Sequence, residues 1–584
     1  MTGPAPAVAS PEGRPRSAAA PPGPPEEARR RGARWRWPLA VGAVVAVALG
    51  VRLWGIGHGL PFAYHGDENA HFVPVAIRFF DHGLNPKYFV NPPGYSELLY
   101  LVFGLRYGFE GGAVEAFRLD PGSVILTGRL VSAVLGAVSV WLLYLAGARF
   151  FDRRAGLLAA GILAVAFLPV FYAHQALNDA ASLAPFALSL LGTALVLRRG
   201  HPLDWALAGG ALGLAAGTKY TCGLALLPLA AAALIRLARG PRRPALLGVG
   251  VAIAATFAGF LIANPYALAD WDLFVRDLRR QSAGVQRVHV GQDEHNGFAY
   301  YGWVMTWGLG WLPAAAAVAG AVLLALRDRA LALVLVPAPI LMLLFVGNQT
   351  VFFARYALPV VPLLCLLAAY AAARLVAVVR SRRPRLAPAA WAGLALALCA
   401  QGVAASVHGD GVLARADTRN TTRSWLLSHL PAGTKIVVGP ILPKHRPENG
   451  LRWLAPRPGA AAALREWPVR RYGSSYERTL RPSLLDRYAR AGYCWVVTAS
   501  TRAGFTFVGP RRLPGAIAYY RALERRGRLA FRASPFADGA RADLGEEQVR
   551  FQWDWSWNYY PREYERPGPV MSVYRLTDGA CRSR

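Results

Sequence analysis

The chain has 584 residues, of which 54% are hydrophobic and only 17% charged, and its mean hydropathy is +0.27. These values exclude an ordinary soluble enzyme and favour a mostly α-helical, polytopic membrane protein with some soluble mass attached. The formal net charge of +31 comes from Arg residues clustered between apolar runs. It therefore indicates membrane topology and anionic lipid partners rather than nucleic acid, because no nucleic-acid recognition motif accompanies it.

The N-terminal part of the chain is expected to be a tail followed by a membrane anchor. Residues 1–36 are rich in Pro, Ala, Gly and Arg, a composition that cannot bury a core, so we expect a disordered cytoplasmic tail. The apolar run from Trp37 to about Ile56 follows a cluster of Arg residues. Because the run is long and no small-residue cleavage site follows it, we interpret it as a signal anchor rather than a cleaved signal peptide.

Residues 37–406 are predicted to form a transmembrane domain of about eleven spans. Arg clusters fall in every second connecting segment, which the positive-inside rule places in the cytoplasm. The segments 57–122 and 264–296 are therefore expected to be outer loops, and the length of the first favours a catalytic role. After the first run, the apolar runs lie at 123–148, 155–172, 179–197, 203–218, 221–237, 245–263, 297–326, 330–347, 353–379 and 386–406.

The run from Gly94 to Gly108 is apolar enough to resemble a further span. If it crossed the membrane, every later Arg cluster would lie outside the cytoplasm. We therefore expect it to be an interfacial or re-entrant helix within the first outer loop.

Residues 407–584 are expected to form a C-terminal α/β domain. Strand-like segments at 435–438 and 493–498 alternate with helical stretches. An odd number of spans before this domain places it outside the cytoplasm. Cys494 and Cys581 are the two cysteines that lie outside the apolar runs, so the sequence allows one disulfide without requiring it.

The first candidate for chemistry is the stretch from Tyr64 to His71 in the first outer loop. It contains two adjacent carboxylates, Asp67 and Glu68, between His65 and His71. Charge at the edge of a membrane is costly, and a carboxylate there can deprotonate a hydroxyl or hold a divalent cation. A structural alternative is that the acidic pair only begins a surface helix. Glu68 and His71 have the spacing of half a metal site without a second half, so the sequence requires no cofactor and leaves a divalent metal open.

Further polar side chains are expected at the same membrane face. Carboxylate, amide and imidazole groups occupy one short outer segment, and a Lys and an Arg lie at the mouths of later spans. These cations can bind a phosphate, although snorkelling to the interface is the alternative for both. Carboxylates and cations at one face fit transfer of a group from a lipid phosphate. The candidates are His174, Asn178, Asp179, Lys219, Tyr220, Arg355 and Tyr356.

Several short motifs follow one another in a fixed relation to the predicted spans. They are Gly66-Asp67-Glu68, Asn91-Pro92-Pro93-Gly94, Thr127-Gly128-Arg129-Leu130, Arg149-Phe150-Phe151-Asp152, Ala176-Leu177-Asn178-Asp179, Gly217-Thr218-Lys219-Tyr220 and Ala354-Arg355-Tyr356. Over roughly residues 37–406, this order resembles the C-type glycosyltransferase superfamily. The resemblance is to the bacterial branch similar to protein O-mannosyltransferases and to the aminoarabinose transferase that modifies lipid A.

The resemblance implies a membrane glycosyltransferase that moves a sugar from a polyprenyl-phosphate donor to a lipid, cell-envelope glycan or protein hydroxyl, with inversion at the anomeric carbon. The reaction would take place on the outer face of the bacterial cytoplasmic membrane. Asp67 would be the catalytic carboxylate, with Glu68 beside it and Asp179 as a second acid in the same cavity. The donor phosphate would be held by Lys219, Tyr220, Arg355 and Tyr356, and the acceptor or the loop would be positioned by His65, Asn91, His174 and Asn178.

One departure from this pattern bears on the substrate. Where aminoarabinose transferases carry Glu-Lys-Pro, this chain has Val90-Asn91-Pro92, which removes a charged partner and argues against that sugar. Two other functions stay open: a lipid or solute transporter gated by the acidic loop, and a catalytically silent relative that only binds glycan. The internal repeats and midplane charges typical of transporters are not found in the sequence.

Overall fold

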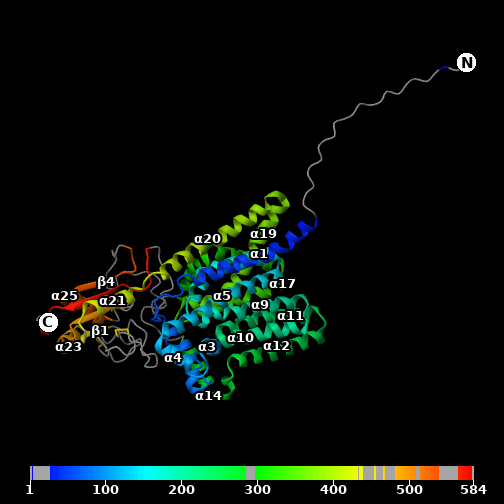
Figure 1. The fold of residues 1–584 in the computed structure, drawn as a ribbon. Coiled ribbons are helices and arrows are strands. Elements are labelled where there is room, and N and C mark those ends of the chain that lie inside the picture. The colour runs from blue at the N-terminus through cyan, green and yellow to red at the C-terminus, as the bar shows by residue number, and fades with distance from the viewer. Residues whose placement is uncertain are drawn as a thin grey trace.

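The computed structural model consists of a helical bundle and a smaller part built on a β-sheet, which lies at one end of the bundle (Figure 1). Parts of the expected tail 1–36, of the outer loop 264–296 and of the C-terminal domain fall outside the described residues. Within that tail, the backbone of the first helix begins at Glu26. The structure describes Gly3 and residues 26–284, 296–431, 433–438, 453–454, 464–466, 480–500, 503, 506–507, 513–537 and 563–581.

Twenty α-helices make up the described part of the chain up to Leu413, joined in places by short helical turns. The helices are α1 (Glu26–Leu53), α2 (Val73–His82), α3 (Gly94–Tyr107), α4 (Gly112–Leu119), α5 (Pro121–Phe150), α6 (Arg153–Val165), α7 (Phe167–Ala173), α8 (Asn178–Ala181), α9 (Leu183–Arg198), α10 (Pro202–Thr218), α11 (Leu226–Arg239), α12 (Arg242–Ala263), α13 (Tyr266–Ala269), α14 (Trp271–Gly284), α15 (Gly297–Met305), α16 (Trp311–Arg327), α17 (Arg329–Leu335), α18 (Pro337–Gly347), α19 (Val361–Arg382) and α20 (Ala387–Leu413). The turns are η1 (Glu68–Phe72), η2 (Tyr220–Ala225), η3 (Thr306–Gly310), η4 (Ala354–Val360) and η5 (Pro384–Leu386).

Helix starts in the bundle follow from local chemistry. α5 begins with Pro121 directly after Asp120, whose side chain accepts a hydrogen bond from the Ser123 N–H. α6 begins after Asp152, whose carboxylate accepts from two successive backbone N–H groups. Both arrangements satisfy backbone donors that a helix start leaves without partners. They fix the residues at which α5 and α6 begin.

The chain is a multi-pass membrane protein, but the predicted count of eleven spans is not confirmed. Among the described residues, eight helices are long and apolar enough to cross a membrane. The count reaches nine if α6 and α7, which are bent by 57° at their junction, form one broken span. The apolar part of α1 and the 17-residue α10 are too short to be counted. At about 1.5 Å per residue, 17 residues reach roughly 25 Å, less than a hydrocarbon core of about 30 Å.

The apolar run after residue 94 forms α3, which has 14 residues. A helix of that length reaches only about 21 Å and is too short to span a bilayer. Its first residue, Gly94, lies against the end of α10, where an added Cβ would sit 2.7 Å from the carbonyl oxygen of Gly217. The close approach requires glycine here and holds the first loop against the segment that leads to Lys219.

The C-terminal part is a mixed α/β unit, as the sequence predicts. Its five-stranded sheet has the order β2-β1-β3-β5-β4, with β1 parallel to β2 and β3, and β5 antiparallel to β3 and β4. Its elements are α21 (Thr418–His429), β1 (Thr434–Val438), β2 (Leu464–Glu466), α23 (Ser483–Arg490), β3 (Trp495–Ala499), α25 (Pro514–Arg526), β4 (Gly527–Ala533) and β5 (Met571–Leu576).

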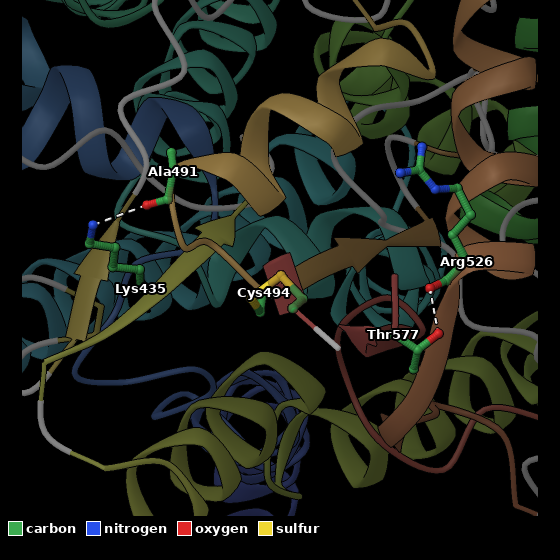
Figure 2. The surroundings of a disulfide bond; sticks show 6 residues. Lys435, Ala491, Cys494, Arg526 and Thr577 are labelled. Atoms are coloured by element: carbon green, nitrogen blue, oxygen red, sulfur yellow. Dashed lines mark hydrogen bonds between the residues drawn. A yellow bond between two sulfur atoms is a disulfide. The ribbon is translucent and has the colours of Figure 1, made fainter. Parts of the chain in front are cut away.

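A disulfide closes this unit. Cys494, directly before β3, is bonded to Cys581 near the end of the chain, so the disulfide that the sequence allows is present (Figure 2). Nearby, the Lys435 amine donates to the Ala491 carbonyl at 3.0 Å, and the Thr577 hydroxyl donates to the Arg526 carbonyl at 3.0 Å. The bond joins the start of a central strand to the segment after β5.

Candidate active site

The two adjacent carboxylates of the first loop point into different surroundings. The loop after α1 enters η1 and then α2, so the chain becomes helical at Glu68. Successive residues of a helical turn point about 100° apart. The Asp67 side chain is 30% exposed, whereas that of Glu68 is fully buried. Each carboxylate therefore meets its own set of partners.

Asp67 is paired with Arg355, although the two residues are 288 positions apart in the chain. An Arg355 nitrogen lies 3.0 Å from the Asp67 carboxylate, and the His71 Nε2 lies 3.7 Å from its other oxygen. The backbone N–H of Asp67 donates to the His65 Nδ1 at 3.2 Å. Three of the residues named from the sequence thus surround the predicted catalytic carboxylate.

The charges around Asp67 set its protonation state. Burial alone would raise the pKa of the Asp67 carboxyl. The Arg355 guanidinium opposes burial most strongly, and the net result is a pKa below the usual value. Smaller contributions in the same direction come from His65, His71 and Lys219. The pairing with Arg355 therefore favours the ionised form of Asp67.

Arg355 is held in place by aromatic rings. It lies in η4, just before α19, and its side chain is 13% exposed. Its guanidinium carbon sits 4.3 Å from the centre of the Phe353 ring and 5.8 Å from that of Tyr356. Such cation–π contacts favour one orientation of the planar group. Tyr356 therefore supports Arg355 from its own turn of the chain.

A second carboxylate–cation pair lies beside the first. Asp179, in α8, forms an ion pair with the Lys219 amine, and their side chains are 3% and 10% exposed. Lys219 directly follows α10 in an extended conformation, which turns the chain out of the helix. The Asn178 amide donates to the Thr218 carbonyl at 2.8 Å and ties the two segments together.

The two pairs form one electrostatic cluster. The charge of Lys219 acts on Asp67, and the charge of Asp179 acts on Arg355. α8, which carries Asp179, and η2, which follows Lys219, both pack against η4, which carries Arg355, so the two pairs lie beside each other. Such a cluster can take a proton at a carboxylate and bind an anion at the cations.

Glu68 has a different set of contacts. Its two oxygens accept hydrogen bonds from the Arg129 guanidinium at 2.7 and 2.8 Å, and one of them also accepts from the Ala176 N–H at 2.8 Å. Arg129, from α5, donates further to the carbonyls of Ile56 at 2.8 Å and His58 at 2.7 Å. Glu68 therefore ties the first loop to α5 and to the segment before α8.

Two other residues predicted from the sequence, Asn91 and Tyr220, support the loop around the charge cluster. The Asn91 amide donates to the Tyr88 hydroxyl at 3.1 Å, and the Tyr88 ring stacks on His71 with centres 5.1 Å apart. The Tyr220 hydroxyl donates to the Phe89 carbonyl at 2.8 Å and so holds the same segment. Asn91 and Tyr220 thus act on the site through neighbours rather than by touching Asp67.

His174 belongs to a separate, fully buried polar group. Its ring nitrogens contact the carbonyls of Val170 and Trp54, each at 2.9 Å, and one lies 3.5 Å from Asp410 of α20. The His58 ring, in the loop after α1, lies with its centre 6.5 Å from that of His174. Burial is the main cause that lowers the pKa of His58. The structure therefore does not bring His174 to Asp67.

Sequence reasoning missed Arg129 and Tyr88. Arg129 belongs to the motif Thr127-Gly128-Arg129-Leu130, but the sequence analysis assigned it no role. A cation within a 30-residue apolar helix could have indicated one. Tyr88 has no feature in the sequence that separates it from other aromatic residues in loops.

Glu68 and His71 are the metal candidates from the sequence. The oxygens of Glu68 accept hydrogen bonds from Arg129 and Ala176. In the part of the chain that the structure describes, no group of three or more His, Cys, Asp or Glu is arranged to hold a metal ion.

Comparison with known proteins places these features in a family context. Residues 118–263 match the family model of dolichyl-phosphate-mannose-protein mannosyltransferases. A search of curated proteins found no match. The oligosaccharyltransferase AglB from Archaeoglobus fulgidus, in complex with an inhibitory peptide and a dolichol-phosphate, is similar (TM-score 0.53, 11% identity, 86% of this chain and 73% of that one). An oligosaccharyltransferase from the same organism in the apo form is similar as well (0.52, 13%, 86% and 74%). The apo form of ArnT from Cupriavidus metallidurans also matches (0.47, 17%, 79% and 92%).

These comparisons confirm the resemblance that the motifs predict. The matched range of the family model contains Arg129, Asp179 and Lys219, whereas Asp67 and Arg355 lie outside it. At 11% and 13% identity, the likeness to AglB concerns the fold. The pairing of Asp67 with Arg355 is thus an observation on this chain itself.

Proposed function

We propose, from this family match and the charge cluster, that the protein is a membrane glycosyltransferase that moves a sugar from a polyprenyl-phosphate donor to an acceptor hydroxyl. The observation that carries the proposal is the pairing of Asp67 with Arg355 beside the pair formed by Asp179 and Lys219. A base beside phosphate-binding cations is what this transfer needs. The AglB structure that shares the fold contains a dolichol-phosphate, a polyprenyl phosphate without a sugar.

The reaction is a single displacement. The acceptor hydroxyl gives its proton to the Asp67 carboxylate while its oxygen forms a bond to the anomeric carbon of the sugar. The bond between that carbon and the phosphate oxygen breaks, and the polyprenyl phosphate leaves with the bonding electrons. Arg355 and Lys219 neutralise the charge that develops on the leaving oxygen. Attack opposite the leaving group inverts the anomeric centre.

The donor can also prepare the base. In the structure each cation is paired with a carboxylate, Arg355 with Asp67 and Lys219 with Asp179. The donor's phosphodiester carries one negative charge on two oxygens, so it competes with the carboxylates for these cations, and it gains a second charge as the bond to the sugar breaks. When Arg355 turns to the phosphate, the pKa of Asp67 rises toward the value that burial favours. Asp67 thereby becomes a stronger base when the donor is bound.

Glu68 supports this site as a positioning residue. Its oxygens accept three hydrogen bonds from Arg129 and the Ala176 N–H, and its side chain is fully buried, so it is not open to an acceptor. It sits one residue after Asp67 and fixes the loop to α5. The chemistry therefore rests on Asp67, and the position of Asp67 rests partly on Glu68.

The site faces the outside of a bacterial cytoplasmic membrane in this proposal, with the N-terminus in the cytoplasm. The disulfide between Cys494 and Cys581 supports an extracytoplasmic C-terminal domain, because disulfides persist in oxidising compartments. The Arg clusters support the same orientation. Since the first loop contacts the C-terminal domain, the Asp67 site lies on that same side.

The test uses purified protein in lipid nanodiscs with a panel of undecaprenyl-phosphate sugars and an acceptor mixture of Ser/Thr peptides, lipid A and cell-envelope glycan. Mass spectrometry follows release of undecaprenyl phosphate. Wild type and Asp81→Asn, an exposed carboxylate change on α2, are expected to release it from at least one donor. Asp67→Asn is expected to release none. Full release by Asp67→Asn contradicts the base assignment, and no release by wild type contradicts the donor class.

A further inference from the structure

Two aromatic residues of the segment that precedes Asp67, Phe62 and Tyr64, pack against the C-terminal domain, whereas Ala63 between them packs into the bundle. Phe62 is 8% exposed and shares a hydrophobic cluster with Leu426 of α21 and Val573 of β5. The Arg423 guanidinium, also from α21, lies 5.4 Å from the centre of the Phe62 ring. A residue five positions before Asp67 is thus part of the core of a distant domain.

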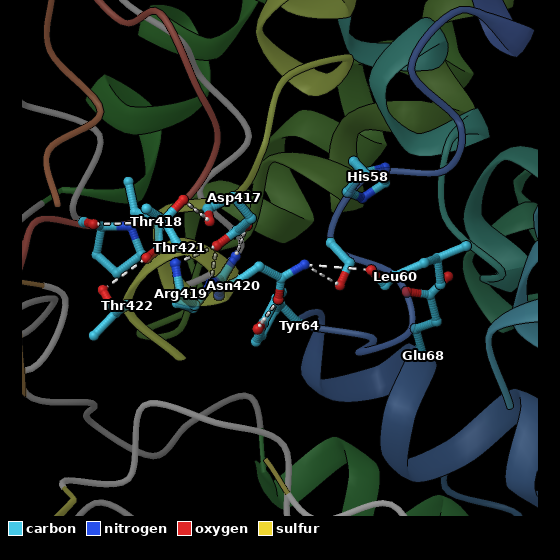
Figure 3. A network of polar contacts seen from close by, with 12 residues as sticks. His58, Leu60, Tyr64, Glu68, Asp417, Thr418, Arg419, Asn420, Thr421 and Thr422 are labelled. Atoms are coloured by element: carbon cyan, nitrogen blue, oxygen red, sulfur yellow. Dashed lines mark hydrogen bonds and ion pairs between the residues drawn. The ribbon is translucent and has the colours of Figure 1, made fainter. Parts of the chain in front are cut away.

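Polar contacts hold the same segment to α21 (Figure 3). The Tyr64 hydroxyl donates to the Asn420 side-chain oxygen at 2.5 Å. The Asn420 amide nitrogen donates to the carbonyls of Gly59 at 3.0 Å and Leu60 at 3.3 Å. One side chain therefore satisfies three groups of the loop, and it does so from both ends of the segment 59–64.

The Tyr64 ring is fixed as well as its hydroxyl. The Arg419 guanidinium carbon lies 3.6 Å from the ring centre, and Arg419 is itself held by the buried Asp417 carboxylate at 2.7 and 2.8 Å. The Trp453 indole N–H donates to the Tyr64 hydroxyl at 3.3 Å. A stacked cation, a hydroxyl bond and an indole donor together leave the ring one orientation.

The helix that supplies these contacts is rigidly attached to the sheet. The Thr418 hydroxyl donates to the Pro569 carbonyl at 2.7 Å, and the Thr418 N–H donates to the Pro567 carbonyl at 2.9 Å. Gly568 between them has a φ of +100°, and a Cβ there would lie 2.2 Å from the Thr418 hydroxyl. The start of α21 therefore moves with the segment that leads into β5.

We propose that Tyr64 and Asn420 form a clamp by which the C-terminal domain positions Asp67 for catalysis; this inference rests on the proposed function. Tyr64 lies three residues before Asp67, and Glu68 with its Arg129 partner lies one residue after it. The carboxylate is thus held between two anchors, one in each part of the molecule. Arg355 belongs to the bundle, so the clamp sets the separation between Asp67 and Arg355.

The clamp has a consequence for turnover rather than for donor binding. The donor's phosphate contacts cations of the bundle, which the clamp does not touch. Placement of the base, in contrast, depends on the segment 59–64, and a displacement of about 1 Å in a reacting group can slow a reaction by about 100-fold. Tyr64 and Asn420 are therefore positioning residues for the acceptor step.

The experiment measures kcat, donor KM and the acid limb of the pH profile for Tyr64→Phe, Asn420→Ala and the double variant, with the donor that wild type accepts. Ser428→Ala, an exposed change on the same helix, is the matched control. We expect kcat to fall about tenfold in each single variant and donor KM to stay within about twofold. The double variant is expected to lose less than the product of the two single losses, because both changes remove the Tyr64–Asn420 hydrogen bond.

Three results distinguish a failure of the clamp proposal from a failure of the proposed function. Wild-type kcat in both single variants, with Asp67→Asn inactive, overturns the clamp and leaves the proposed function standing. A kcat loss that disappears when the assay temperature is lowered shows a defect of stability only and also overturns the clamp. Full activity of Asp67→Asn overturns the proposed function itself, whatever the clamp variants do.

Discussion

Two carboxylate–arginine pairs, made by neighbouring residues of one loop, differ in almost every physical respect. An Arg355 nitrogen lies 3.0 Å from the Asp67 carboxylate, and the Asp67 and Arg355 side chains are 30% and 13% exposed. Glu68 and Arg129 are joined by two hydrogen bonds and are 0% and 1% exposed. In the proposed function the more exposed pair serves the reaction and the buried pair serves the structure, so burial separates the roles of the same residue types.

The difference has an energetic basis. A buried ion pair that is fully hydrogen-bonded cannot release a partner without leaving a charge unpaired in a low dielectric, which is strongly unfavourable. A partly exposed pair keeps access to water, and either partner can exchange its contact for a ligand. A base that must take a proton and a cation that must bind phosphate need a partly exposed pair. The first loop contributes one carboxylate to a partly exposed pair, Asp67, and one to a buried pair, Glu68.

The sharpest way to break the comparison is to remove the partner of the buried pair. Arg129→Met leaves the Glu68 carboxylate buried without its cation and is expected to destabilise the protein by about 3–5 kcal/mol. Little folded protein should remain, as monitored by gel filtration and thermal unfolding in detergent. Arg118→Met is the control, because Arg118 makes a similar bidentate pair with Glu115 on the surface and its loss should leave the unfolding midpoint unchanged. Equal behaviour of the two variants would contradict the structural role of Arg129.

The next change removes the partner of the exposed pair. Arg355→Met should fold and should lose about 100-fold to 1,000-fold in kcat/KM, because a charge that stabilises the leaving phosphate is gone. The pKa of Asp67 is held down mainly by Arg355 against burial, so it should rise in the variant. Asp67 acts only when ionised, and its activity is lost as the pH falls through its pKa. The acid limb of the pH–rate profile should therefore move to higher pH, and an unmoved limb would contradict the pairing.

The smallest expected effect concerns His71. Its ring lies 3.7 Å from Asp67, beyond hydrogen-bond distance, and stacks on Tyr88. His71→Phe preserves the stack and removes only the ring nitrogens, so kcat should fall about twofold to fivefold. Steady-state assays against Asp81→Asn as the unaffected reference measure this directly. A loss as large as that of Arg355→Met would mean that His71 takes part in proton transfer.

Much of the site could be predicted from the sequence because its residues are chemically unusual where they stand. Asp67, Asp179, Lys219 and Arg355 are charged groups at the ends of apolar runs, and a charge at such a place needs a reason. That Lys219 pairs with Asp179, and Arg355 with Asp67, required the tertiary structure. The sequence predicts which segments lie at one membrane face, but it does not predict which of their side chains contact one another.

The rest could not be predicted, for physical reasons that differ from case to case. Glu68 looked equivalent to Asp67 because the sequence does not show the direction of each side chain in η1. Tyr64 and Asn420 are 356 positions apart, and neither is rare in a loop or at a helix start. The predicted span count is not confirmed, because apolar runs as short as α10 satisfy a hydropathy pattern without the length to cross a bilayer.

The most direct test replaces the two neighbouring carboxylates one at a time by amides and measures turnover and thermal unfolding for both variants in the same nanodiscs. Asp67→Asn is predicted to unfold at the wild-type temperature and to lose at least about 1,000-fold in turnover. Glu68→Gln is predicted to unfold roughly 5 °C or more below wild type, because the charge of Arg129 loses its buried partner. The opposite pattern, an unstable Asp67→Asn and a stable but inactive Glu68→Gln, would contradict the division of roles between the two residues.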